Sequence, residues 1–301
     1  MLSGVAAYLI YAALPLSVNL RAFASDFVSF LQPAMIFCML FLSFSRINPK
    51  DLRFTRWHLW LLLIQSGCFV AMALIIHFTN FSQAVDILIE SAMLCLICPT
   101  ATASVVITDK LGGDVAAIVA YTMMINMTTA LVVSLFIPIL NPTIDMAFWQ
   151  AFVVMIRKVF SILVLPLILA IFVRKFLPAV NKLVCKPKDL PFYLWVVSLS
   201  LALAVTTRSI AHTDVSWYFI MGIGLISALC CIFQFKMGHL IGRHYKDKVT
   251  AGQAFGQKNT IFLIWISYTF MNPVTSLAGG LYSIWHNLYN SYQLYQKRKT
   301  T

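Results

Sequence analysis

The chain has 301 residues, of which 60% are hydrophobic and only 11% are charged, and its mean hydropathy is +0.85. Soluble domains carry about 25% charged residues, so this composition excludes an ordinary soluble protein. The formal charge of +12 lies in the gaps between apolar segments, which argues against a nucleic-acid-binding face.

Apolar segments long enough to cross a bilayer recur along the whole chain. A hydrocarbon core of about 30 Å needs roughly 20 helical residues, so we expect an all-α integral membrane protein. The N-terminal segment lacks the charged start and cleavage site of a signal peptide, and it is expected to remain as the first helix. The ten predicted membrane helices are 4–20, 25–45, 56–78, 84–108, 114–139, 148–174, 190–207, 215–236, 246–270 and 272–294.

The sixth segment, 148–174, is longer than one untilted span and contains Arg157 and Lys158. One interpretation is an interfacial helix over 148–157 that leads into a shorter span. The other is a single tilted helix whose two cations reach the interface.

Basic residues mark alternate gaps, and short loops rich in Lys and Arg stay on the cytoplasmic side. We therefore predict an inner (plasma) membrane protein with both termini in the cytoplasm, which requires an even number of spans. The opposite gaps and the start of the sixth helix carry only Arg21, Arg157, Lys158 and Arg208. The cytoplasmic set is Arg46, Lys50, Arg53, Arg56, Lys110, Arg174, Lys175, Lys182, Lys186, Lys188, Lys236, Arg243, Lys246, Lys248, Lys297, Arg298 and Lys299.

Two predicted helices contain small, polar, helix-weakening runs: 98–104 (CPTATAS) in the fourth and 252–260 (GQAFGQKNT) in the ninth. Pro99 removes a backbone donor, and Gly256 weakens the helix around it. The fourth and ninth spans are equivalent in a five-plus-five inverted repeat, whose binding site lies where such broken helices meet. The exposed N-terminal ends of half-helices suit an anion. The alternative is an ordinary kink at Pro99 with hydroxyls bonded back to the helix.

At these residues the chain resembles the bile acid:sodium symporter family and its bacterial relatives. The similar motifs are Cys98-Pro99 with Thr102-Ala103-Ser104, Gly113-Asp114-Val115-Ala116, Gly256 with Asn259-Thr260, and Trp285-His286-Asn287. The resemblance implies two inverted five-helix repeats in which the broken fourth and ninth helices cross. It also implies a panel (about 1–55 and 146–210) against which a core (about 56–145 and 211–295) moves. Substrates in the family are organic anions, usually carried with sodium.

The resemblance further implies site residues. Thr102, Asn259 and His286 match positions that line the family's anion pocket, and Thr260 is assigned to the substrate site with them. On the residues alone, a single imidazole such as His286 is as consistent with a structural histidine.

The ion sites depart from the family pattern. The family's glutamate falls on Ala254, a glutamine on Lys258 and an asparagine on Val105, whereas Gln65, Ser104 and Thr122 persist as candidate ion or coupling residues. A hard cation needs several oxygen ligands, so sodium is not expected at the usual positions and no metal is assigned.

A lysine at a helix centre costs about 2.5–3.5 kcal/mol on insertion scales, so Lys258 calls for an explanation. One hypothesis is that its ammonium occupies the space of the missing sodium and holds the broken helices together. A second is that it loads and releases a proton. A third is that it reaches the cytoplasmic interface. For Glu90 and Asp86, one helical turn apart, we favour an outer-interface position in contact with water over a proton-coupling role.

The predicted function is thus secondary transport of a small organic anion across the bilayer, with proton and sodium as open coupling ions and no cofactor or nucleic acid. The alternatives are a sodium-coupled symporter with rebuilt ion sites and a non-transporting membrane sensor. An enzyme is not expected, because the six histidines form no HExxH pattern and no nucleophile elbow is present. The substrate stays open. All seven cysteines are expected to pack in the core: Cys38, Cys68, Cys95, Cys98, Cys185, Cys230 and Cys231.

Overall fold

The computed structural model describes residues 2–15, 17–140, 147–187, 190–212 and 215–300. Within these ranges the chain is helical and forms no β-strand, which confirms the all-α class. The helices are α1 (Leu2–Ala13), α2 (Val18–Ser45), η1 (Pro49–Asp51), α3 (Arg56–Phe78), α4 (Gln83–Ile97), α5 (Ser104–Leu111), α6 (Val115–Leu140), α7 (Phe148–Leu163), α8 (Leu165–Phe176), α9 (Pro178–Cys185), α10 (Leu190–Ala211), α11 (Trp217–His244), α12 (Lys248–Gly256), α13 (Thr260–Phe270), η2 (Pro273–Ser276) and α14 (Leu277–Thr300).

Several of these helices have the length and composition of membrane spans. Helices α2, α3, α6 and α11 are each long and apolar enough to cross a bilayer, and the bent pair α7–α8 passes the same test as one span. Apolar but shorter stretches lie in α1, α10 and α13. The described residues therefore contain four or five candidate membrane helices by length and composition, and the ten-span arrangement stays a prediction.

The turn between the first two helices lies earlier than the expected gap at 20–25. Helix α1 ends at Ala13, and α2 begins at Val18. Pro15 cannot donate a backbone hydrogen bond and cannot continue α1. The Ser17 hydroxyl accepts a hydrogen bond from the Leu20 N–H (3.4 Å) and caps α2. Hydropathy alone placed the boundary wrongly because the residues after Ser17 are also largely apolar.

The sixth predicted segment is a bent pair of helices rather than an interfacial helix that ends at 157. Helix α7 continues through Arg157 to Leu163, and α8 leaves it at an angle of 45°. Pro166, in the first turn of α8, lacks the N–H that a continuous helix would need. Two details lie outside the described residues: Lys188, and the expected panel–core boundary at 145–146.

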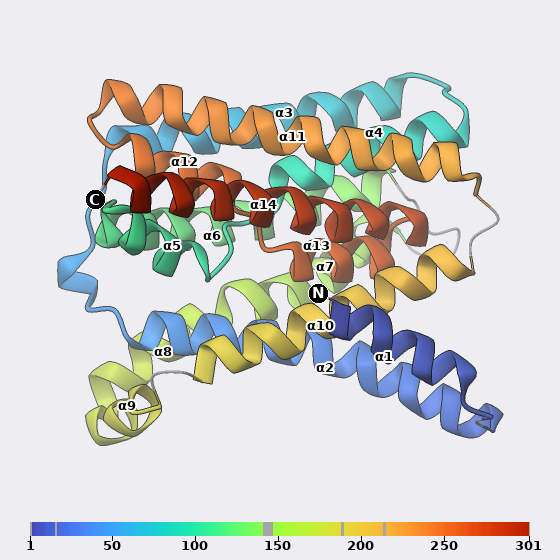
Figure 1. Cartoon of the computed structure of the whole chain (residues 1–301), viewed down its shortest axis with the longest axis horizontal. Coiled ribbons are helices and arrows are strands. Elements are labelled where there is room, and N and C mark those ends of the chain that lie inside the picture. Colours follow the sequence, from blue (N-terminus) through green and yellow to red (C-terminus); the bar gives the residue numbers. More distant parts are fainter. Residues whose placement is uncertain (1, 16, 141–146, 188–189, 213–214, 301) are drawn as a thin grey trace.

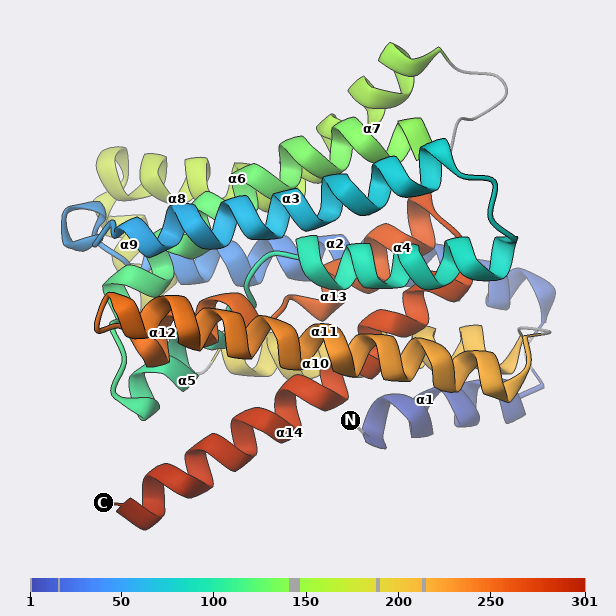
Figure 2. The same ribbon diagram turned by 90° about the horizontal axis from the view of Figure 1, so that it is seen from above.

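The helices pack as two layers (Figure 1). The thin layer consists of α1, α2, α8, α9 and α10, and the thick layer of α3–α6 and α11–α14. The layers are joined by α7, which packs on both α6 and α2, and by contacts of α10 with α13 and α14. Seen from above, α3, α4 and α11 run side by side, whereas α14 crosses obliquely and its C-terminal end projects beyond them (Figure 2).

Helices α11 and α12 form a hairpin whose backbones touch. A methyl group added at Gly238 would lie 2.5 Å from the Ala251 carbonyl oxygen, and one at Gly242 would lie 2.7 Å from the Asp247 carbonyl oxygen. The turn between the helices contains Lys246 in the left-handed conformation (φ 59°). Glycine is required at both positions because the backbones of α11 and α12 approach closely there. The contact fixes the position of α12, which ends at the second helix break.

Replacing Gly238 with alanine should force α11 and α12 apart, because the clashing atom is backbone and cannot rotate away. Overpacking of this kind costs about 1–3 kcal/mol, so we expect a lower unfolding temperature for the purified protein. The matched control is Gly67→Ala in α3, where an added methyl group meets no atom within 4 Å. That control should be neutral or slightly stabilising, since alanine favours helix. Equal unfolding temperatures for the two variants would contradict the backbone contact.

Candidate functional site

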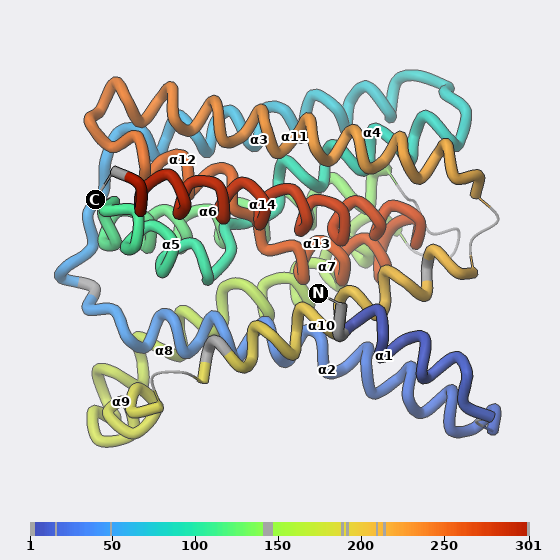
Figure 3. The backbone as a smooth tube through the Cα atoms, viewed as in Figure 1, coloured from blue at the N-terminus to red at the C-terminus, as the bar shows by residue number. Residues whose placement is uncertain are grey.

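Both predicted helix breaks are present in the structure. Helix α4 ends at Ile97, directly before Cys98 and Pro99, and α5 begins at Ser104. Helix α12 ends at Gly256, where an added methyl group would lie 2.4 Å from the Phe235 ring. Both interruptions are extended stretches of chain near the middle of the molecule (Figures 2 and 3).

The two extended segments cross and bond to each other. Thr100 and Lys258 form an isolated antiparallel β-bridge. The flanking backbone hydrogen bonds run from Ala101 N to Gln257 O (2.9 Å) and from Asn259 N to Pro99 O (2.8 Å). Backbone amides and carbonyls that lose their helical hydrogen bonds inside an apolar protein need other partners. At the crossing, each extended segment supplies these partners for the other.

Side chains satisfy several of the remaining carbonyls at the two helix ends. The Gln65 amide donates to Ile97 O (2.9 Å) and Cys98 O (3.1 Å), and the Thr100 hydroxyl donates to Ala254 O (2.6 Å). The Tyr282 hydroxyl donates to Gly256 O (2.8 Å). Sequence reasoning missed Tyr282, although it lies one helical turn before His286 on the same face of α14.

The four predicted substrate residues line one small cavity beside the crossing. Thr102, Asn259, Thr260 and His286 share it with Lys258, and α2 and α10 of the thin layer close its other side. Its volume of about 20 Å³ leaves room for roughly one water molecule. The cavity therefore lies between the two layers and is closed to any organic anion in this conformation.

Three groups at this cavity lack hydrogen-bond partners in the described part of the chain, and one of them is the Gln257 Oε1 atom, a neutral acceptor. The His286 side chain is 5% exposed, and its Nδ1 atom is buried without a partner. The Lys258 side chain is 1% exposed, and its ammonium is likewise unpaired. Unsatisfied buried polar groups are expensive, so these two are the strongest evidence that the crossing binds something.

The surroundings of Lys258 are neutral. Its Nζ atom lies 5.1 Å from the centre of the Phe255 ring, and its electrostatic neighbours are the thiols of Cys98, Cys95 and Cys230. No described carboxylate lies within ion-pair distance of it. Because the side chain is almost fully buried, it does not reach the cytoplasmic interface.

The three neutral residues predicted to take part in ion coupling differ in how their side chains are used. Gln65 uses its amide on the α4 carbonyls and accepts from the Tyr121 hydroxyl (3.0 Å). The Thr122 hydroxyl donates to Ile118 O within α6 (2.8 Å), whereas the Ser104 hydroxyl is buried without a partner among the described residues. The described residues contain no group of three His, Cys, Asp or Glu side chains that could hold a metal ion.

Two expectations about individual residues are wrong. Glu90 does not face water: its side chain is 7% exposed, and the Thr275 hydroxyl of η2 donates to it at 2.9 Å. This contact could not be predicted from local patterns because the two partners are 185 positions apart. Cys38 is exposed rather than packed in the core.

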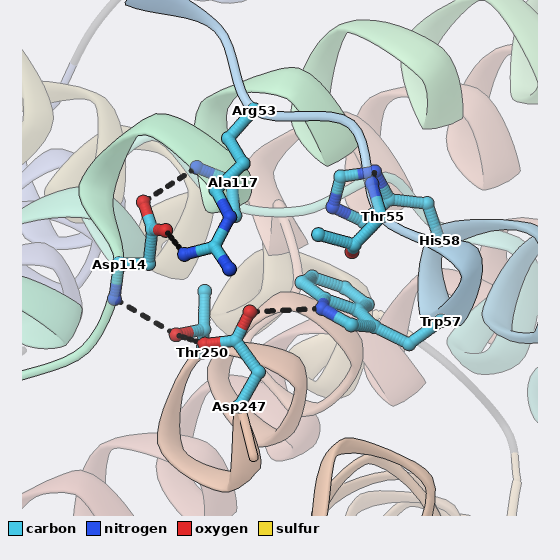
Figure 4. A network of polar contacts seen from close by, with 8 residues as sticks. All are labelled: Arg53, Thr55, Trp57, His58, Asp114, Ala117, Asp247 and Thr250. Atoms are coloured by element: carbon cyan, nitrogen blue, oxygen red, sulfur yellow. Dashed lines mark hydrogen bonds and ion pairs between the residues drawn. The ribbon is translucent and has the colours of Figure 1, made fainter. Parts of the chain in front are cut away.

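A separate polar network ties three turns together at the α11–α12 end of the thick layer (Figure 4). Arg53 forms an ion pair with Asp114 at 2.6 Å, and Asp114 also accepts from the Ala117 N–H and so caps α6. Thr250 donates to Asp247 (2.7 Å) and accepts from the Asp114 N–H (2.9 Å). The carboxylates of Asp114 and Asp247 and the Thr250 hydroxyl are paired within this network, so we assign it a structural role.

No protein-family model matches the chain, and no curated protein matches it either. The crossing and the unpaired groups beside it are therefore the features of the molecule that bear on its function.

Replacing Gln65 with leucine should leave the Cys98 carbonyl without its side-chain donor. Such a loss costs about 1–3 kcal/mol, and we expect a lower unfolding temperature for the purified protein. The control is Leu63→Ala on the same helix, where the side chain is 64% exposed, and its effect should stay within about 0.5 kcal/mol. If Gln65→Leu were as stable as the wild type, the amide would not support the break.

The Asp114 network predicts acid sensitivity. Burial raises the pKa of this carboxyl, but hydrogen bonds from the Ala117 N–H and Arg53 outweigh burial and leave the pKa below its usual range. A carboxyl whose pKa is lower when folded contributes stability above its unfolded pKa of about 3.9, and that contribution is lost as the pH falls through the folded pKa. Thermal unfolding measured between pH 7 and 3 should show a loss below about pH 4 that is smaller in Asp114→Asn. The exposed neighbour Asp109, changed to Asn, should keep the wild-type profile; a loss of equal size in all three proteins would rule out Asp114 as its source.

Proposed function

We propose that the chain is a secondary transporter of a small organic anion, in which the thick layer moves against the thin layer. The observation that carries this proposal is the pair of unpaired buried groups, Lys258 and His286, beside a closed cavity between the layers. Ionisable residues inside membrane proteins are costly and usually functional. A negatively charged ligand would offset that cost at both groups.

The proposal takes each broken or bent pair as one span. With α4–α5, α7–α8 and α12–α13 counted in this way, α1, α2, α3, α6, α10, α11 and α14 complete ten spans. The crossing supports an arrangement as two inverted five-helix repeats, because such repeats place their interrupted helices at one midplane site. Both termini then lie in the cytoplasm, as the loop charges favour.

The closed cavity gives the proposed transport cycle a physical requirement. Pockets that enclose drug-sized ligands have volumes of about 300–1,000 Å³, whereas this cavity has about 20 Å³. Thr102, Asn259, Thr260 and His286 therefore meet the anion only after α2 and α10 separate from the crossing. Alternating access is the opening of this boundary from one side and then from the other.

Lys258 takes the place of a bound cation in the proposed mechanism. A fixed ammonium between two broken helices supplies positive charge where members of the bile acid:sodium symporter family, which the chain resembles, use sodium. The family's glutamate and asparagine positions hold Ala254 and Val105 here, which supports transport that does not depend on sodium there. The ammonium either stays charged throughout the cycle or exchanges its proton.

The test is transport by Lys258→Met in liposomes, with the substrate first selected from an organic-acid panel by thermal stabilisation. A ligand at 100 times its dissociation constant adds about 2.7 kcal/mol to stability. We expect Lys258→Met to be at least as stable as the wild type, because it removes an unpaired buried charge, and to lose anion uptake. Lys236→Met, at an exposed lysine of α11, is the matched control and should transport normally.

Uptake should persist when sodium is replaced by choline. A strict sodium requirement, or normal uptake by Lys258→Met, would refute the role proposed for the ammonium. Ligand binding without any flux in the same preparation would instead identify a sensor.

A further inference from the structure

A second cavity lies between α1, α2 and α10, away from the crossing. Its volume is about 200 Å³, ten times that of the cavity at His286. Tyr8 of α1, Gln32 of α2 and Arg208 of α10 line it, and Tyr268 at the end of α13 reaches it from the thick layer. Helix α10 packs against both α1 and α2 in the thin layer (Figure 1).

The cavity contains one cation and no carboxylate among its described lining residues. Arg208 is exposed at the cavity, and its only hydrogen bond to a described side chain is a long one of 3.4 Å to the Ser25 hydroxyl. A guanidinium has five N–H donors, so this single neutral contact leaves most of them and the whole charge available. An acidic group is the ligand that matches this end of the cavity.

The opposite end carries a buried donor without a partner. The Gln32 side chain is 5% exposed, and its amide nitrogen bonds to no described group. An amide N–H buried in this way calls for an acceptor such as a hydroxyl or carbonyl oxygen. Ser25 and Gln32 are seven residues apart in α2, which at 1.5 Å per residue separates the two ends by roughly 10 Å.

The wall between the two ends is largely aliphatic. Val28 of α2 and Leu201 and Val205 of α10 line it, together with alanines from all three helices. A ligand that fits has an acidic head, an apolar body and a second oxygen roughly 10 Å from the head. A ligand with a charged head and an apolar body is an amphipathic organic acid rather than an inorganic anion.

We propose that the cavity between α1, α2 and α10 binds an amphipathic organic monoanion, whose acidic head meets Arg208 and whose distal oxygen accepts from Gln32. The inference deepens the proposed function, since α2, α10 and α13 line both cavities and a ligand held here lies next to the boundary that must open. Binding to this cavity is measured without flux, so the two proposals can fail separately.

The test is calorimetric titration of the full-length protein in uncharged detergent with three probes. These are 8-hydroxyoctanoate, octanoate, which lacks the distal oxygen, and 1,8-octanediol, which lacks the charge. We expect the wild type to bind 8-hydroxyoctanoate most tightly and the diol most weakly. Arg208→Gln should weaken both acids about tenfold or more and leave the diol unchanged.

Gln32→Leu should reduce the affinity for 8-hydroxyoctanoate to that for octanoate and leave octanoate itself unchanged. Neither substitution removes a strong internal contact, so both proteins should fold. Lys236→Met, at an exposed lysine of α11 that lines neither cavity, is the control and should bind all three probes as the wild type does. The inference is overturned if the wild type shows no preference for acids, or if Lys236→Met weakens their binding as much as Arg208→Gln does.

A bilayer lipid with an anionic headgroup shares part of this chemistry. The titration is therefore repeated in nanodiscs of phosphatidylcholine with and without phosphatidylglycerol. Unchanged affinity for 8-hydroxyoctanoate supports a soluble acid as the ligand. Complete loss of probe binding in the phosphatidylglycerol discs would assign the cavity to lipid and refute the proposal.

Discussion

The antiparallel pairing of Thr100 with Lys258 is the constraint on which the centre of this protein depends. A helix broken inside an apolar protein exposes amides and carbonyls that have no water to bond. Here two breaks are placed so that each segment completes the backbone hydrogen bonds of the other. Neither segment could be extended alone without a large cost, so the two breaks form one structural unit although 158 residues of sequence separate their centres.

The pairing explains how the surrounding helices are arranged. Helix α12 must lie close enough to α11 for its end to reach the crossing, and the hairpin achieves this through backbone contact at Gly238. Gln65 of α3 and Tyr282 of α14 then hold the carbonyl ends of the two half-helices from opposite directions. A unit stabilised from several helices is rigid, which suits an element that carries a site between two layers that move.

Some polar side chains at the crossing bond to the broken helices, and others are left available to a ligand. Gln65 and Thr100 donate to backbone oxygens of the broken helices, whereas Lys258 Nζ and His286 Nδ1 are buried without described partners. Unpaired buried groups of this kind are tolerated where a ligand bonds to them. In the proposed cycle, the cavity beside them opens only when the layers separate. Gln32 follows the same logic in the second cavity, where one unpaired donor and one exposed cation define opposite ends of a ligand.

Local chemistry was enough to determine the helical class, the bounds of α3 and the two breaks. Apolar segments of membrane length and a proline within them act through neighbouring residues only, so the sequence contains these signals directly. The contacts of Glu90 and the cavity at Arg208 depended on tertiary structure. Each arises where segments distant in the chain pack together, and hydropathy along one segment does not specify its partner. The sequence thus indicated where two helices break, and only the packing decided which of their polar groups are left for a ligand.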